Sequence, residues 1–402
     1  MTEENMDIYE RALARHAETR GKIEIRSRMR LETQEDLSMA YTPGVARPCE
    51  VIAKDPGAAW DLTWKGRTVG IVSDGSAVLG LGDIGPMASL PVMEGKAALF
   101  HEFAGIDAVP IVLDARDPAE IINIVKAIAP TYGGINLEDI SAPRCFEIEN
   151  ALQDIGIPVL HDDQHGTAIV LLSAVINAAR VLGTSLGQLS VVLNGAGAAG
   201  GAICNLLLCK DSSEVCIPVG KMRVCDSKGV IWPGRPGNTP QKDEIGELTN
   251  PECDKGDLRA AMRGANVFIG VSKGGLINAA DVKTMAKDPI VLAMANPVPE
   301  IMPDEAKAGG AAIIGTGRSD FPNQVNNVLA FPGLFRGALE ARAKKFTTGM
   351  KFAAITAITS SVEEPTPNRI LPSPFDRSVA VKVADAVAAA ARRAGVCHDH
   401  GK

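Results

Sequence analysis

Ser190-Val-Val-Leu-Asn-Gly-Ala-Gly-Ala-Ala-Gly200 is the stretch that decides the fold of this chain of 402 residues. An apolar strand ends at Gly195, the pattern G-x-G-x-x-G follows, and the proline-free apolar run 201–208 continues as a helix. The amides at such a helix start face an anion, and the glycines let a pyrophosphate approach the backbone. The stretch predicts a dinucleotide-binding unit, and its cofactor-binding residues are Gly195, Ala196, Gly197, Ala198, Ala199 and Gly200.

Further strands extend this unit into a parallel sheet covered by helices. The predicted strands are 189–193, 222–225, 267–271, 290–294 and 312–314. Asp226 ends the second of them, where an acceptor for a ribose hydroxyl belongs. Ser272, Asn296 and the run 315–318 follow the later strands, so they are predicted to lie beside the nicotinamide ribose and the substrate. Ordinary turn chemistry is the alternative interpretation of each.

The first half of the chain shows a second alternation of strands and helices. Strands are predicted at 68–73, 108–113 and 157–160, and helices at 93–103, 118–129 and 142–152. A long apolar helix over 167–182 places a domain joint near 165. The prediction is an α/β protein with an N-terminal substrate and metal domain (1–165), a Rossmann-like doubly wound domain (166–350) and a C-terminal helical segment (351–402) that packs back on the body.

The pattern G-x-G-x-x-G also occurs at residues 80–85, but Pro86 and Pro91 follow it. Prolines at these positions would remove or distort a helix that faces a phosphate. We therefore interpret this first motif as a glycine turn that lines a cleft.

Two acidic pairs follow strand-like runs. They are Glu138-Asp139 and Asp162-Asp163. In a parallel sheet both pairs fall on one edge, where a hard cation such as Mg²⁺ or Mn²⁺ would offset their repulsion. Helix capping is the structural alternative. A zinc site that uses His161 and His165 is disfavoured, because a loop is expected there and a catalytic Glu is missing.

Lys96 stands at the head of an otherwise apolar helix candidate. Burial or a neighbouring cation would let such a lysine lose its proton near neutral pH, and a surface lysine is the alternative.

Charge and composition exclude several classes of protein. Lys and Arg number 41 against 48 Asp and Glu, and no basic block is available for a nucleic acid. Residues 1–16 lack the apolar core of a signal peptide, and no apolar run approaches the length that crosses a bilayer. We expect a cytoplasmic protein without nucleic-acid or membrane partners. The eight cysteines include no C-x-x-C pair and are expected to be reduced thiols.

Taken together, the motifs between residues ~38 and ~340 resemble those of the malic enzymes, and specifically of their compact bacterial-type branch. The motifs are Tyr41-Thr-Pro-Gly-Val-Ala46, Val78-Leu-Gly-Leu-Gly-Asp-Ile-Gly85, Met93-Glu-Gly-Lys96, Asn136-Leu-Glu-Asp139, His161-Asp-Asp-Gln-His-Gly-Thr-Ala168, Asn194–Gly200, Ala295-Asn-Pro297 and Asn323-Gln-Val-Asn-Asn327.

The resemblance implies a role for each matching residue. Tyr41 corresponds to the general acid, Lys96 to the general base, and Asp162 to a neighbour that sets the orientation and charge of the lysine. The metal ligands would be Glu138, Asp139 and Asp163, and the contacts to substrate and nicotinamide would be Asn296, Asn326 and Asn327. Leu79 stands where larger malic enzymes carry an arginine, which leaves open how the substrate carboxylates are held.

The implied reaction is the metal-dependent oxidative decarboxylation of L-malate to pyruvate and CO₂ with reduction of NAD or NADP. Malolactic or oxaloacetate-decarboxylating activity on the same site, or a non-catalytic dinucleotide sensor, are the alternatives. Asp226 favours NAD, whereas Ser227 and Lys228 could accept a 2′-phosphate, and NADP is preferred. The resemblance also implies a homodimer or higher homo-oligomer, in which Tyr41 serves its own or the partner subunit.

Overall fold

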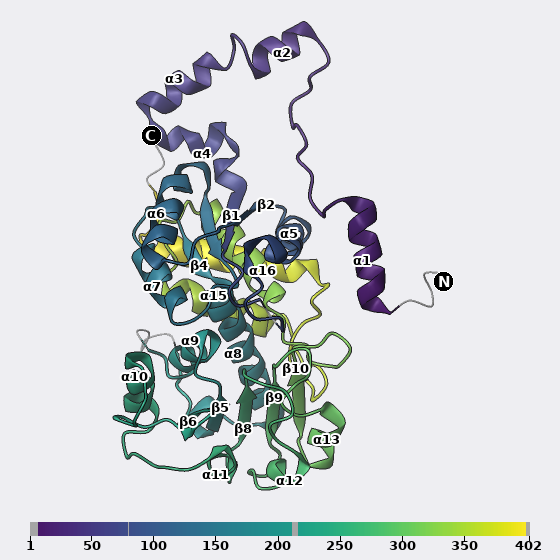
Figure 1. The fold of residues 1–402 in the computed structure, drawn as a ribbon, viewed down its shortest axis with the longest axis vertical. Helices are drawn as coiled ribbons and strands as arrows, with labels where there is room; N and C mark the ends of the chain where they lie inside the picture. Colours follow the sequence, from purple (N-terminus) through teal and green to yellow (C-terminus); the bar gives the residue numbers. More distant parts are fainter. Residues whose placement is uncertain (1–6, 79, 211–215, 399–402) are drawn as a thin grey trace.

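Two sheets of mainly parallel strands, one in each half of the chain, lie one beyond the other along the long axis of the molecule (Figure 1). The computed structural model describes residues 7–78, 80–210 and 216–398. Strand order is β2-β1-β3-β4 in the first sheet and β10-β9-β8-β5-β6-β7 in the second. Both halves therefore have the predicted α/β architecture.

The first sheet is entirely parallel and carries the acidic pairs at one edge. Its strands and helices are β1 (Thr68–Ser73), α5 (Gly85–Ala104), β2 (Asp107–Val112), α6 (Pro118–Ile128), β3 (Gly134–Leu137), α7 (Arg144–Ala151) and β4 (Val159–His161). All six residues of β1 are buried, as expected for a central strand covered on both faces. Leu137 pairs with His161 across β3 and β4. The residues that follow these two strands therefore meet at the carboxyl edge of the sheet.

Helix α8 (Asp162–Leu182) joins the two sheets. It begins five residues before the predicted start at 167, and His161 is its N-cap, so the expected loop around His165 is wrong. Gly166 lies within the helix, and a glycine is favoured there because a Cβ would lie 2.0 Å from Asp162 Oδ1. By length and composition α8 would suffice to cross a membrane, which corrects the expectation that no run approaches that length. However, 67% of its most apolar window is buried, as in a core helix.

The second sheet contains five parallel strands and one antiparallel edge strand. Its elements are β5 (Ser190–Asn194), α9 (Ala198–Leu207), β6 (Lys221–Asp226), β7 (Gly229–Val230), α10 (Pro240–Thr249), α11 (Leu258–Met262), β8 (Val267–Gly270), α12 (Ala279–Val282), β9 (Ile290–Ala293), α13 (Pro303–Ala308) and β10 (Ile313–Thr316). The five parallel strands match the predicted ones to within a few residues. The two-residue β7, which turns back on β6, was not predicted.

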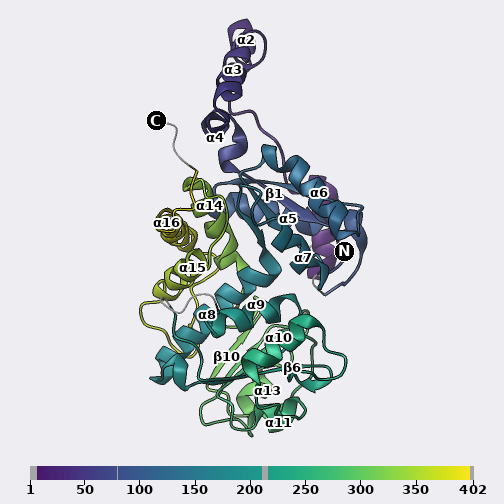
Figure 2. The ribbon, with the colours of Figure 1, turned by 90° about the vertical axis from the view of Figure 1, so that its left-hand side faces the viewer.

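The chain then returns to the first sheet. The returning elements are the short 3₁₀ helix η6 (Asn327–Leu329), α14 (Phe331–Glu340), α15 (Thr348–Ser360) and α16 (Arg377–Arg393). The rings of Phe331 and Phe335 pack edge-on against Phe100 of α5. Figure 2 shows these helices beside the first half rather than beside the second sheet. The division into domains at 165 and 350 stays a prediction.

Residues 7–54, which we call the N-terminal arm, extend away from this body (Figure 1). The arm contains α1 (Ile8–Thr19), α2 (Gln34–Ala40) and α3 (Ala46–Lys54), and none of these helices buries a residue. Lys22 fastens the arm to α5, because its amide donates to Glu94 and its ammonium to the carbonyl of Pro91. Short turns and helix α4 (Ala59–Leu62) lead on to β1.

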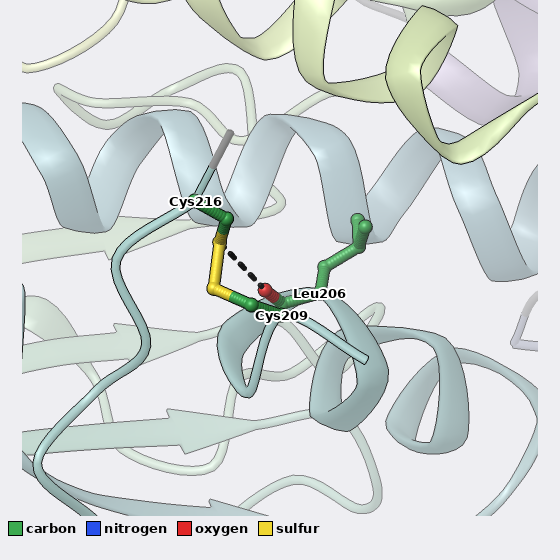
Figure 3. The surroundings of a disulfide bond; sticks show 3 residues. All are labelled: Leu206, Cys209 and Cys216. Carbon is green, nitrogen blue, oxygen red and sulfur yellow. Dashed lines mark hydrogen bonds between the residues drawn. A yellow bond between two sulfur atoms is a disulfide. The ribbon is translucent and has the colours of Figure 1, made fainter. Parts of the chain in front are cut away.

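A disulfide between Cys209 and Cys216 corrects the expectation that all cysteines are reduced (Figure 3). Cys209 has a positive φ just beyond the end of α9, and the chain returns so that the two Cα atoms lie 5.7 Å apart. That separation is typical of disulfides. A spacing of seven residues does not predict this disulfide, because the spacing alone does not show that the two cysteines lie close together. The other six cysteines are free thiols.

Candidate active site

Helix α5 brings Lys96 to the carboxyl edge of the first sheet. The helix begins at Gly85, the last glycine of the first motif, and has Pro86 in its first turn and Pro91 inside it. The expectation that these prolines would remove or distort the helix is therefore wrong. A proline is tolerated in the first turn, where amides have no partner within the helix. The motif itself is a tight turn, in which the amide of Gly82 donates to the carbonyl of Val78.

Lys96 is buried between two carboxylates. Its Nζ donates to Glu138 Oε1 at 2.9 Å and to Asp162 Oδ2. The ring of Phe331 lies under the ammonium, with 4.0 Å between Nζ and the ring centroid. Only 6% of the lysine side chain is exposed. The surface-lysine alternative is thus excluded, and three segments distant in sequence meet at one amine.

The electrostatics of this cluster differ from the expectation for Lys96. Burial alone would lower its pKa, but the charges of Asp162 and Glu138 raise the pKa above its ordinary value. Burial raises the pKa of Glu138 well above its ordinary value, and the charges of neighbouring aspartates add to this effect. Burial also raises the pKa of Asp162. In this arrangement the lysine is the charged partner that stabilises buried carboxylates, not a free base.

The acidic side chains lie close together at the sheet edge, and carboxylate oxygens are the kind of ligand that a hard divalent cation prefers. The amide of Asp139 donates to Asp163 Oδ2 at 2.8 Å, while Glu138 and Asp162 share Lys96. Asp162 Oδ1 is buried, accepts no hydrogen bond and packs against Gly166, so this aspartate contacts Lys96 and Asn327 through its other oxygen. One lysine cannot neutralise four carboxylates. Among the described residues no three His, Cys, Asp or Glu side chains already converge as ligands of one ion, and in this conformation Lys96 bridges the cluster.

The two histidines of the zinc alternative lie in different surroundings. His165 contacts Glu149 and Lys351, whereas neither ring nitrogen of the buried His161 has a hydrogen-bond partner. The described residues therefore offer no paired imidazole ligands.

The second glycine motif forms the predicted strand–turn–helix. A Cβ on Gly200 would lie 1.9 Å from the carbonyl oxygen of Gly195, so only glycine allows α9 to start so close to β5. A Cβ on Gly197 would meet nothing within 4 Å, which leaves the approach to the helix start open. These are the features that a dinucleotide pyrophosphate needs, and the motif fits that group.

Residues from neighbouring strand ends line the same edge of the second sheet. Asn194 Nδ2 donates to Ser272 Oγ at 2.8 Å. Glu300, which sequence reasoning missed, accepts from the amides of Ser272 and Ala295 and so ties the ends of β8 and β9 together. A buried acid between two prolines gave no signal in the sequence, because its partners are backbone amides.

The three asparagines predicted to contact the substrate lie in different surroundings. Asn327 Nδ2 donates to Asp162 Oδ2, so it reaches the lysine cluster. Asn326 instead caps the turn that follows it, by accepting from the amide of Val328. Asn296 lies by the first glycine turn, since a Cβ on Gly80 would lie 3.7 Å from its carbonyl oxygen. The glycine turn of the first half thus faces the β9 loop of the second half across the site.

Asp226 lies at the end of β6 as predicted, but its carboxylate already has partners. Its oxygens accept four hydrogen bonds, from the amide of Lys228 (2.9 Å), from two guanidinium nitrogens of Arg235 (3.0 and 2.5 Å) and from Lys242 Nζ (2.7 Å). Although burial opposes it, the bonds from Arg235 and Lys242 lower the pKa of Asp226 to about 2. A carboxylate has about four acceptor positions, so none is left for a ribose hydroxyl.

Tyr41 is not brought to Lys96 within one chain. It lies in the N-terminal arm between α2 and α3, and 70% of it is exposed. Leu79, the residue that replaces an arginine, lies outside the described residues.

Comparisons with known proteins agree with this geometry. The model of the Malic enzyme, N-terminal domain matches residues 20–153, and that of the Malic enzyme, NAD binding domain matches residues 164–392. The chain belongs to the malic enzyme family. A bifunctional malic/malolactic enzyme of Bacillus subtilis is 51% identical over 97% of this chain and 95% of its own length. An NAD-dependent malic enzyme of Geobacillus stearothermophilus is 54% identical over 94% of this chain and 78% of its own.

Solved malic enzyme structures have the same fold. The NAD-dependent malic enzyme of Thermotoga maritima aligns with a TM-score of 0.89 and 46% identity, over 94% of this chain and 98% of that one. The malic enzyme of Pyrococcus horikoshii aligns with a TM-score of 0.90 and 44% identity, over 98% of this chain and 93% of that one. An NADP-dependent relative from Escherichia coli is 45% identical over 94% of this chain, which spans about half (51%) of its length. The predicted family and α/β fold class are thus confirmed.

Proposed function

We propose that this chain catalyses the oxidative decarboxylation of L-malate to pyruvate and CO₂, with reduction of a nicotinamide dinucleotide and dependence on Mg²⁺ or Mn²⁺. The observation that carries the proposal is the buried contact of Lys96 with Asp162 and Glu138. An amine fixed between carboxylates at a sheet edge is an arrangement for moving a proton. We also propose that the protein is cytoplasmic.

In this proposal Lys96 Nζ accepts the proton of the malate C2 hydroxyl. The amine must first be neutral, and Asp162 and Glu138 are the described side chains within hydrogen-bond distance that can hold its proton. Asn327 holds the other side of Asp162 and so fixes the direction of the lysine. Phe331 excludes water from one side of the amine, because its buried ring lies against Nζ.

Glu138, Asp139 and Asp163 are the residues that would hold the divalent ion, and the second glycine motif would hold the dinucleotide. When bound, the ion supplies electrophilic stabilisation of negative charge on the substrate oxygens, and the nicotinamide supplies the hydride acceptor. Ser272 and Asn296 follow the ends of β8 and β9, and Asn327 begins η6; in this proposal these three residues contact the nicotinamide and the substrate. Asn326, occupied as a cap, would contact substrate through its backbone.

We propose NADP as the preferred dinucleotide. The carboxylate of Asp226, which would have favoured NAD, is occupied by Arg235 and Lys242. Together with Lys228 these side chains leave a net positive charge at the end of β6, where a 2′-phosphate would lie.

Substitution of Lys96 by alanine tests the proposed function. Purified wild-type protein with malate, Mn²⁺ and NADP⁺ should produce NADPH, measured at 340 nm, and pyruvate in equal amounts. The Lys96→Ala variant should bind the dinucleotide normally but turn over about 10²–10⁴-fold more slowly. A variant rate near that of wild type would remove Lys96 from the mechanism.

A malolactic activity on the same site is the second candidate, favoured by the bifunctional Bacillus subtilis relative. Lactate formed from malate without net NADPH would identify it, and pyruvate with stoichiometric NADPH would exclude it as the main reaction.

The general acid Tyr41 is proposed to act in a second copy of the chain. The helices of the N-terminal arm bury no residue, although Lys22 fastens the arm to α5. The arm exposes the apolar residues Ile8, Leu13, Ile23, Ile25, Met29, Leu31, Leu37, Met39 and Val45. A two-fold dimer would cover these residues and present Tyr41 to the partner's site.

Mixing two inactive variants tests this arrangement. Equal amounts of Tyr41→Phe and Lys96→Ala chains, unfolded and refolded together, should recover roughly a quarter of the wild-type activity, because half the dimers carry one complete site. If Tyr41 serves its own chain, no mixture recovers activity.

A further inference from the structure

A partly buried polar cluster lies behind the carboxylates of the site, and no step of the proposed reaction uses it. It consists of Glu149 on α7, His165 on α8 and Lys351 on α15. Lys351 Nζ lies 3.0 Å from His165 Nδ1, and His165 Nε2 lies 3.0 Å from Glu149 Oε1. The three side chains thus connect three helices, one of which comes from the C-terminal part of the chain.

The direction of these hydrogen bonds follows from the chemistry of the groups. An ammonium only donates, so Lys351 donates to His165 Nδ1. The imidazole proton is then on Nε2 and is donated to Glu149. The neutral ring therefore stands between a partly buried cation and a buried anion, and each of the three groups has its partner.

Glu149 also holds the start of α8. Its carboxylate accepts from the amide of His161 at 3.0 Å and from Gln164 Nε2 at 3.2 Å. His161 is the N-cap of the helix, so this bond satisfies an amide at the helix terminus, where a negative charge is favoured. Only 7% of Glu149 is exposed.

The residues that Glu149 holds flank the two aspartates of the site on both sides. Asp162 and Asp163 lie between His161 and Gln164 in the first turn of α8. Asp162 contacts Lys96 and Asn327, so a small rotation of this turn would displace both contacts. Catalytic groups need to be held to within about 0.5 Å by their supporting residues.

We propose that Glu149, held by His165 and Lys351, is a positioning residue that orients Asp162 and Asp163 for metal binding and catalysis. The inference rests on the proposed function, because it takes Asp163 as a ligand of the divalent ion. It gives the C-terminal helix α15 a part in the geometry of a site to which it contributes no reacting group.

The first test compares Glu149→Gln with Glu147→Gln, an exposed glutamate on the same helix. Mn²⁺ alone is titrated into the full-length proteins, and NADP⁺ binding is measured separately. Glu149→Gln should raise the dissociation constant of Mn²⁺ by about 10–100-fold, the usual effect of losing a residue that orients a metal ligand. NADP⁺ binding should not change, and Glu147→Gln should match wild type. Hydrogen exchange at residues 160–166 should be faster in Glu149→Gln.

The second test addresses the connection to α15 and does not depend on the folding of Glu149→Gln. Lys351→Met should weaken Mn²⁺ binding, Lys351→Arg should restore most of it, and Lys345→Met serves as a matched control from an exposed pair with Asp154. The double variant Glu149→Gln/Lys351→Met should lose less than the product of the two single losses, because removing both charges leaves neither unpaired.

Two results would overturn the inference. One is a Mn²⁺ affinity within about twofold of wild type in folded Glu149→Gln and Lys351→Met. The other is an equal loss of Mn²⁺ and NADP⁺ binding, which would indicate general destabilisation. If wild type itself neither binds Mn²⁺ nor converts malate, the proposed function is wrong, and this outcome differs from a failure of the positioning role alone.

Discussion

Replacing Lys96 with methionine removes the one cation in a buried group of acids and keeps the volume of the side chain. Glu138 and Asp162 each lose a direct ion pair, and both are almost fully buried. Removing one partner of a buried pair typically destabilises a protein by about 3–5 kcal/mol. We expect a loss of this size without metal. Mn²⁺ at 100 times its dissociation constant should stabilise the variant by about 2.7 kcal/mol, because the ion binds the folded state and not the unfolded one.

The loss should depend on pH. The pKa of Glu138 is raised in the folded protein, so its contribution to stability is complete below the unfolded pKa and is lost as pH rises through the folded pKa. Without Lys96 this pKa rises further, and the deficit relative to wild type should be larger at pH 8 than at pH 5. Calorimetry with and without Mn²⁺ measures both effects, and Lys345→Met is the control. A variant as stable as wild type at pH 8 without metal would refute the reasoning.

Three further substitutions separate the parts of the site. Gly197→Ala should leave the melting temperature nearly unchanged, because its Cβ meets nothing, but should weaken dinucleotide binding about 10-fold or more in fluorescence titrations. Lys242→Ala should lower kcat/KM for NADP⁺ by about 10-fold while sparing NAD⁺, with Lys221→Ala as control; equal losses would contradict the 2′-phosphate assignment. Asn327→Ala should lower kcat more than it raises the KM of malate, since its amide holds Asp162.

Sequence patterns predicted the parallel strands and the turns and acidic residues that follow them. The parallel strands, the dinucleotide turn and the meeting of Glu138 with Asp162 all follow from runs of apolar residues and from what ends them. Helix starts were less well predicted. Gly166 and Pro91 are usually helix breakers, yet one is required by close packing against Asp162 and the other lies within α5.

The pKa of Lys96 and the partners of Asp226 could not be predicted, because they depend on residues that are distant in the sequence. Lys96 was expected to be easily deprotonated, but two carboxylates surround it and reverse the direction of its pKa. Phe331, which shapes that environment, comes from a helix that the sequence places far away. Asp226 looked like a free acceptor because its partners Arg235 and Lys242 lie beyond a turn whose course the sequence does not reveal.

The polypeptide passes between its two sheets twice, outward through α8 and back through the segment 317–330 that leads to α14. Two crossings restrict how the two sheets could move apart, because such a motion would have to turn about the line that joins the crossings. Asp162 begins the first crossing and Asn327 stands on the second, and a hydrogen bond joins their side chains. Asp162, which orients Lys96, therefore lies on the line that joins the two crossings, where a hinge motion between the sheets would displace it least.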